Sequence, residues 1–327
     1  MKEHVESFIA KLEEGIAIGQ KAVINQHSHE IRNIIVAGLG GSGIGGTIAA
    51  AVLDTELKVP VTIVKDYFLP GFADQHTLLL ACSYSGNTEE TLQTFDAAIK
   101  TGAKIICITS GGKLLELAKQ HNCDAIIIPG GMPPRACFPY SFTQIFYALK
   151  GMNLIGDSVV HELESTVSFL KSEETSIKKL AAEFASKLTG KIPVIYSEAK
   201  FEGVCIRFRQ QINENAKMLC WHAALPEMNH NELVGLVEPN ENLAVIFIRN
   251  DSDFFRTQRR MEIVKDIAAK VTPYIFEVWS KGNSLIEKTF YHILTGDWIS
   301  VYMAEIKNID ATEVRVIDFL KKELSAI

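Results

Sequence analysis

Short apolar runs alternate with amphipathic stretches along the first half of the chain. Four of these runs are nearly free of charge: 34–40 (IIVAGLG), 77–83 (TLLLACS), 104–110 (KIICITS) and 125–131 (AIIIPGG). Continuous apolar character is typical of parallel strands that are buried on both faces. Stretches with helical spacing, such as 88–102 (TEETLQTFDAAIKTG), separate the runs. The pattern therefore predicts an α/β fold, in which a βαβ series forms a doubly wound parallel sheet flanked by helices.

The second half of the chain repeats this order more faintly. Its apolar runs are 192–198 (IPVIYSE), 243–250 (LAVIFIRN) and 273–279 (PYIFEVW), and helical stretches at 201–219 and 255–270 separate them. Two copies of one α/β unit would account for both halves. A charged helical segment connects the copies, and we expect a boundary near residue 155, with domains at 1–155 and 156–327.

Two segments bear on targeting. Residues 1–15 alternate charged and apolar positions at helical spacing, which predicts an amphipathic helix rather than a secretion signal. Residues 34–53 carry no charge over a length that can span a membrane, but six of them are glycines. Glycines clustered in this way indicate a strand, a tight turn and a buried helix. We therefore expect a cytoplasmic protein.

Composition narrows the classes of function. The chain has 327 residues, of which 47% are hydrophobic and 22% charged, so it can form two ordinary globular cores. A net charge of −6 argues against nucleic-acid binding, which needs a basic face. The six cysteines form no CxxC pair, so neither a zinc site nor a redox motif is indicated. We expect no metal and no cofactor.

A glycine-rich turn, GLGGSGIGG at 38–46, follows the first predicted strand and opens a helix. In such a turn, backbone N–H groups and the positive end of the helix dipole can converge on an anion. The turn also contains GxGxxG at Gly38, Gly40 and Gly43, so a dinucleotide-binding fold is an alternative. Against that alternative, Asp66, which follows Lys65, is the only acidic residue near the end of the next strand region, 59–68 (VPVTIVKDYF).

A second turn, SYSGNTEET at 83–91, is more informative. It follows a strand and presents the hydroxyls of Ser83, Ser85 and Thr88 beside a glycine at the start of a helix. Hydroxyls and free helix N–H groups suit a phosphate monoester, and acidic residues in the first turn fit the helix dipole. The alternative is an ordinary helix cap by Asn87 or Thr88. Two such turns at one sheet edge favour a phosphate site.

Four motifs carry a family resemblance. GGSGIGG and SYSGNTEET are similar to the turns of the sugar isomerase (SIS) domain. With PPRACFPYSF (133–142) and MNHNE (228–232), nearly the whole chain resembles the bifunctional phosphoglucose/phosphomannose isomerases. SIS regulators share the first two motifs but not the last two. The resemblance implies two SIS domains and an enzyme that converts glucose 6-phosphate, and mannose 6-phosphate, to fructose 6-phosphate through a cis-enediol.

The resemblance also implies roles for particular residues. Moving a proton between C1 and C2 requires a base, a cation near the enediolate and an acid–base pair that opens the sugar ring. The family places Glu214 as the base, Arg135 as the cation, and His230 and Lys321 at ring opening. It supplies the histidine from the neighbouring subunit, which implies a homodimer with shared active sites. The expected ligands are small sugar 6-phosphates, and the net charge and the glycine-rich character of 34–53 argue against a nucleic-acid or membrane partner. The residues expected to hold the phosphate are Gly41, Ser42, Ser83, Ser85 and Thr88.

Most of these assignments have a structural alternative. Glu214 lies on a predicted helix three residues before Lys217 and would otherwise be a solvated residue paired with that lysine. Arg135 follows two prolines that stiffen its approach, and a structural salt bridge is its alternative role. His230 would otherwise be a surface or loop-stabilising histidine, although a histidine suits acid–base work near neutral pH.

The C-terminal segment leaves two choices open. The family has a proline where this chain has Ala311, so the alignment does not decide between Lys321 and Lys322 as the ring-opening lysine. Dual activity toward glucose and mannose phosphates is associated with a small residue near this segment. Thr312 and Val314 are both candidates.

Two other functions compete with the isomerase. A non-catalytic SIS sensor would keep the phosphate turns but would not need Glu214, His230 and Lys321. Such sensors usually carry a DNA-binding segment, for which the acidic N-terminal 30 residues are too short. An aminosugar-phosphate isomerase that has lost its glutaminase is the second alternative.

Overall fold

The computed structural model describes residues 1–324. Its first sheet has five strands, and every neighbouring pair is parallel. The strands are β1 (Asn33–Ala37), β2 (Val61–Val64), β3 (Thr77–Cys82), β4 (Lys104–Thr109) and β5 (Asp124–Ile127). Their spatial order is β2-β1-β3-β4-β5. The chain runs from β1 to one edge and from β3 to the other, so the direction of winding reverses between these two strands.

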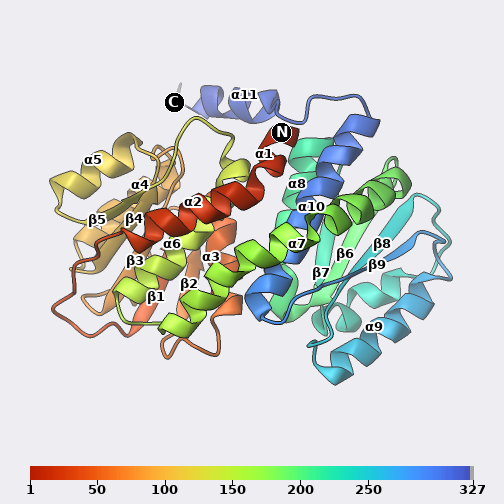
Figure 1. Cartoon of the computed structure of the whole chain (residues 1–327), viewed down its shortest axis with the longest axis horizontal. Helices are drawn as coiled ribbons and strands as arrows, with labels where there is room; N and C mark the ends of the chain where they lie inside the picture. Colours follow the sequence, from red (N-terminus) through yellow and green to blue (C-terminus); the bar gives the residue numbers. More distant parts are fainter. Residues whose placement is uncertain (325–327) are drawn as a thin grey trace. The chain divides into compact units, whose positions relative to one another are not determined.

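Helices pack against both faces of this sheet (Figure 1). They are α3 (Gly40–Val52), α4 (Glu89–Ile99), α5 (Gly112–Gln120) and α6 (Phe138–Gly151), and α2 (Phe8–Gln20) packs against α6. Successive strand residues point to opposite faces, so Ile35 joins a core with Phe95 of α4, whereas Ile34 lies with Ile145 of α6. The residues of β3 are all buried, as expected for a parallel strand covered on both sides.

The second sheet has four parallel strands in the order β7-β6-β8-β9. They are β6 (Ile192–Glu198), β7 (Trp221–Leu225), β8 (Leu243–Arg249) and β9 (Ile275–Trp279). Its helices are α8 (Glu202–Gln211), α9 (Phe255–Ala268), α10 (Leu285–Ile306) and α11 (Arg315–Leu324). Val194, Phe247 and Met261 belong to the core between this sheet and α9. The predicted α/β class with parallel sheets is therefore confirmed for both halves, while β7 was not predicted.

The remaining helices are α1 (Lys2–Glu6), α7 (Asp157–Leu188) and five short segments, η1 to η5. The short segments are η1 (Pro134–Cys137), η2 (Ala199–Phe201), η3 (Ile212–Ala216), η4 (Glu227–His230) and η5 (Glu232–Gly235). Among the helices described between residues 1 and 324, none is long and apolar enough to cross a membrane.

Two compact units make up the chain, and their limits differ from the single boundary expected near residue 155. The first unit contains Glu6–Glu173 and Lys281–Phe290; the second contains Met1–Val5, Glu174–Ser280 and the chain from Tyr291 onward. The reason is α7, a continuous 32-residue helix that takes part in both units. In its first half Glu164 accepts hydrogen bonds from Gln20 and Tyr147, whereas in its second half Lys178 lies over Trp298.

Candidate active site

Two polar turns of the first unit follow β1 and β3, the strands between which the winding reverses. In open α/β sheets, ligands bind at the carboxyl ends of the strands at such a point. After β1 the chain enters α3 at Gly40, whose φ is +52°. After β3 it turns through residues 83–88 and enters α4 at Glu89. The prediction that both turns open helices at one sheet edge is therefore confirmed.

Hydroxyl groups of the two turns are bonded to each other and to the backbone. Ser42 Oγ accepts a hydrogen bond from the backbone N–H of Tyr84, with an N–O distance of 3.1 Å. Ser83 Oγ donates to Thr88 Oγ1 at 2.8 Å. Thr88 occupies the N-cap position of α4, but its side chain makes no capping bond. Ser85 is exposed, and its Oγ accepts from the N–H of Asn87 at 3.2 Å.

The segment that carries Arg135 packs directly against the first turn. Arg135 lies in η1, and its residue is only 4% exposed. A Cβ added to Gly41 would lie 3.0 Å from the carbonyl oxygen of Pro134 and 3.2 Å from the Cα of Arg135. A side chain at position 41 would push these two segments apart. The structure thus brings Gly41, Ser42, Ser83, Thr88 and the Arg135 backbone together within one unit.

The corresponding point of the second sheet lies between β6 and β8, and protein groups occupy it. Glu198, at the end of β6, accepts a hydrogen bond from the backbone N–H of Phe254 at 3.0 Å. After β8, the carboxylate of Asp253 accepts from the backbone and side-chain N–H groups of Asn250. Burial raises the pKa of Asp253 to about 6. Carboxyl groups at this edge disfavour an anion, whereas the corresponding edge of the first sheet carries hydroxyl groups.

Glu214 of the second unit lies on a π-helical turn, η3, that continues α8. The turn ends at Lys217, whose φ of +53° and ψ of +46° place it in the left-handed region. Short π-helical turns and left-handed non-glycine residues cost free energy and are found often at functional sites. The predicted continuous helix over 201–219 is wrong after Gln211, because the α-helical hydrogen-bond pattern changes there.

Cationic and amide side chains bind the carbonyl groups at the end of this turn. Lys217 Nζ donates to the main-chain carbonyls of Glu214 (2.5 Å) and Glu313 (2.7 Å). Lys307 Nζ donates to the carbonyl of Ala216 at 2.7 Å, and Asn213 Nδ2 donates to that of Met218 at 2.7 Å. These bonds satisfy acceptors that a helix end leaves without an intrahelical partner. Hydrogen bonds from side chains within the turn and from Lys307 outside it therefore fix the position of the Glu214 turn.

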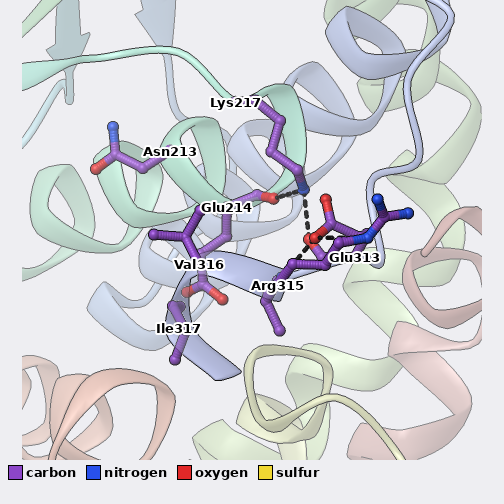
Figure 2. Close-up of a pocket in the computed structure, with 8 residues that line it drawn as sticks. Asn213, Glu214, Lys217, Glu313, Arg315, Val316 and Ile317 are labelled. Atoms are coloured by element: carbon purple, nitrogen blue, oxygen red, sulfur yellow. Dashed lines mark hydrogen bonds and ion pairs between the residues drawn. The ribbon is translucent and has the colours of Figure 1, made fainter. Parts of the chain in front are cut away.

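Glu214 faces a pocket of about 290 Å³ formed by η3 and the start of α11. The pocket is lined by Asn213, Glu214, Lys217, Glu313, Val314, Arg315, Val316 and Ile317. Figure 2 shows the half-buried side chain of Glu214 extending toward the turn that carries Val316 and Ile317. The same view shows the Lys217 ammonium group between Glu214 and Glu313. The π turn thus presents a carboxylate to an open pocket with a largely apolar surface.

The other predicted residues of the second unit lie outside this group. His230 ends η4 and is exposed, and Lys321 and Lys322 are exposed on α11. In the part of the chain that the structure describes, none of the three lines the Glu214 pocket. Of the two candidates for dual activity, Val314 lines the pocket, whereas the hydroxyl of Thr312 accepts a hydrogen bond from the Met1 amino group.

Sequence reasoning missed two polar residues next to the predicted groups. Tyr84 lies inside SYSGNTEET, but its buried hydroxyl contacts a segment nearly fifty positions away, at Met132. Lys307, directly after α10, contacts the end of the Glu214 turn from over ninety positions away. The sequence signal for Tyr84 was its place inside the predicted phosphate-binding motif SYSGNTEET. No local pattern marks Lys307.

Comparisons with known proteins agree with this geometry. Residues 177–324 match the family model described as bacterial phospho-glucose isomerase C-terminal SIS domain. A bifunctional phosphoglucose/phosphomannose isomerase of Caldicellulosiruptor bescii is 36% identical, over 100% of this chain and 99% of that protein. A D-glucosamine-6-phosphate 4-epimerase of Sulfolobus acidocaldarius is 31% identical, over 87% of each chain.

Solved structures show the same fold at lower sequence identity. The C-terminal domain of glucosamine-fructose-6-phosphate aminotransferase from Francisella tularensis superposes with a TM-score of 0.73 and 14% identity, covering 95% of this chain and 98% of that one. Similarity at this level supports the fold alone. Family membership rests on the relatives that match the chain over most of its length. The chain belongs to the family of the bifunctional phosphoglucose/phosphomannose isomerases.

Proposed function

We propose that this chain interconverts glucose 6-phosphate, and mannose 6-phosphate, with fructose 6-phosphate through a cis-enediol. The observation that carries the proposal is the contact of two hydroxyl-bearing turns with the Arg135 segment at one sheet edge. This arrangement offers hydroxyls and helix N–H groups to a phosphate, and the backbone of the buried Arg135 lies beside the first turn, which supports a role for its side chain there. The full-length similarity to a named isomerase supports the same reaction.

Each step uses groups of this chain. Ser42, Ser83, Ser85 and Thr88 hold the phosphate, a remote anchor that fixes the reacting carbons without entering the chemistry. His230 and Lys321 open the sugar ring. Glu214 removes the proton from C2 and returns it to C1, while a hydroxyl proton passes from O2 to O1. Arg135 stabilises the negative charge of the enediolate.

The same base can serve both aldose phosphates. Glucose 6-phosphate and mannose 6-phosphate differ only at C2, so removal of the C2 proton gives enediols of one constitution. Rotation about the C2–C3 bond then presents either face of the enediol to Glu214. Space beside the sugar decides whether this rotation occurs, and Val314 is the pocket residue we assign to this control.

Conversion of each sugar phosphate by the purified protein tests the proposal. We expect fructose 6-phosphate from both glucose and mannose 6-phosphates, with deuterium incorporated at carbon when the reaction runs in D₂O. A non-catalytic sensor would bind these compounds without conversion. The Sulfolobus relative makes a 4-epimerase the second candidate, so glucosamine 6-phosphate belongs in the same assay. Epimerisation at C4 without any ketose formation would overturn the proposal.

We also propose a homodimer in which His230 completes the partner's active site. Mixing Glu214→Gln with His230→Ala then gives mixed dimers with one doubly altered site and one intact site. Random pairing makes half of the dimers mixed, so co-refolded mixtures should recover about one quarter of wild-type activity. If His230 acts within its own chain, every site carries one lesion. Activity no higher than that of the separate variants, with mixed dimers verified by mass spectrometry, would contradict the shared site.

A further inference from the structure

Tyr84 follows β3 at the phosphate edge of the first sheet, and it contacts the segments that follow β1, β4 and β5. It belongs to the loop after β3, and its backbone N–H donates to Ser42 in the first turn of α3, the helix that follows β1. Its carbonyl oxygen accepts from the N–H (2.9 Å) and the Oγ (2.7 Å) of Ser110, after β4. Its hydroxyl accepts from the N–H of Met132, after β5, at 3.0 Å. One residue therefore links, by hydrogen bonds, the segments that follow four strands of the sheet.

The hydroxyl of Tyr84 contacts the segment that carries Arg135. Its N–H donor, Met132, precedes Arg135, and the buried thiol of Cys137 follows it; burial and this nearby thiol both raise the pKa of the Tyr84 hydroxyl. The Cys137 thiol in turn lies 3.5 Å from the carbonyl oxygen of Pro133. Met132 precedes Arg135 by three residues and Cys137 follows it by two. The Tyr84 hydroxyl thus ties the start of the arginine segment to the loop with the phosphate hydroxyls, and the Cys137 thiol closes the segment back onto Pro133.

Burial makes these bonds hard to replace. Tyr84 is 7% exposed and Cys137 is 1% exposed, so water does not compete freely for their polar atoms. A buried donor that loses its acceptor retains its desolvation cost, so the native arrangement of the segment is favoured strongly while the hydroxyl is present. The backbone bonds of Tyr84 to Ser42 and Ser110 do not depend on the hydroxyl. The side chain and the backbone of Tyr84 therefore have separable roles.

We infer that the Tyr84 hydroxyl is a positioning group, which holds Arg135 at the distance from the phosphate turns that the enediolate requires. The inference rests on the proposed function, since it assumes that Arg135 binds the enediolate oxygens. Tyr84 itself does not touch the reacting carbons in this account. It acts by limiting the positions that the arginine can adopt, and orientation of this kind affects the transition state more than substrate binding.

The test compares Tyr84→Phe with Tyr147→Phe. Tyr147 is similarly buried, at 5%, but its hydroxyl contacts Glu164 of α7 rather than a loop of the site. Two probes separate the parts of the site: inorganic phosphate reports the phosphate turns, and a pentonate 5-phosphate, whose carboxylate resembles the enediolate, reports Arg135. We expect Tyr84→Phe to lower kcat and pentonate phosphate affinity about tenfold, with KM and inorganic phosphate affinity within about twofold. Tyr147→Phe should leave all four quantities unchanged.

A double-mutant cycle with Arg135→Ala distinguishes a specific effect of the Tyr84 hydroxyl on Arg135 from a general loss of order in the site. Arg135→Ala alone should weaken pentonate phosphate binding, and adding Tyr84→Phe to it should have little further effect. Full additivity of the two losses, or equal loss of inorganic phosphate affinity in Tyr84→Phe, would overturn the inference. The inference would also be overturned if Tyr84→Phe bound pentonate phosphate with wild-type affinity while Arg135→Ala bound it clearly more weakly. Undiminished pentonate affinity in Arg135→Ala would instead refute the proposed role of Arg135, and the inference with it.

Discussion

Glu214→Gln is expected to lower kcat for fructose 6-phosphate formation by at least about a hundredfold. The amide keeps the shape of the side chain in the pocket but cannot take a proton from carbon. The phosphate turns lie in the other unit and keep all their residues, so sugar-phosphate binding should persist. Initial rates and calorimetric binding of glucose 6-phosphate measure the two properties separately.

Glu313→Gln is the matched control, because Glu313 lines the same pocket and its carboxylate accepts from the N–H of Arg315. We expect this variant to keep most of the wild-type rate. A Glu214→Gln enzyme that turns over at a comparable rate would remove Glu214 from the mechanism. If both variants were equally impaired, the loss would reflect the pocket's charge or shape rather than a base at position 214.

Gly86→Ala is expected to destroy the second phosphate turn. Gly86 has a φ of +70°, and a Cβ added to it would lie 1.8 Å from the carbonyl oxygen of Gly111, a backbone atom that cannot rotate away. We expect the free energy of unfolding to fall by about 2–4 kcal/mol. Separation of the two loops should also weaken inorganic phosphate binding at least about tenfold. Chemical denaturation and calorimetry provide the two measurements.

Gly71→Ala serves as the control for this substitution. Gly71 has no positive φ, and a Cβ there would meet no atom within 4 Å. Its stability and phosphate affinity should match those of the wild type or improve slightly, because alanine restricts the unfolded chain. Wild-type phosphate affinity in a folded Gly86→Ala protein would show that the turn does not bind phosphate.

The strands that could be predicted from sequence are those buried on both faces. β3 and β8 consist of buried residues throughout, so each reads as an apolar run. β7 escaped prediction because it is an edge strand whose first residue, Trp221, is 42% exposed, and because it follows a helix with no recognisable stop. Helices α6 and α10 were missed because buried residues surround them on most sides, which removes the polar face that marks a helix in sequence.

Candidate site residues could be proposed from the sequence where the chemistry is local. Ser42, Ser83 and Thr88 stand in turns whose composition already indicates an anion site, and the strand order places those turns side by side. The roles of Tyr84 and Lys307 depend on contacts between distant segments, which no spacing along the chain records. The π turn at Glu214 was equally invisible, because residues 201–219 show an ordinary helical pattern. Residue chemistry could therefore be inferred from the sequence, whereas contacts between segments that are distant along the chain could not.

The π turn at Glu214 has a consequence for insertions and deletions. An α-helix advances about 100° and 1.5 Å per residue, and a π turn accommodates an extra residue without breaking the helix. Deleting one residue before Glu214 would let this segment return to regular α-helix, but it would also rotate the carboxylate by about 100° around the helix axis. The direction of this side chain is therefore set by the number of residues between α8 and Lys217. Variation in length at this position should be tolerated far less than variation in the side chains that fill it.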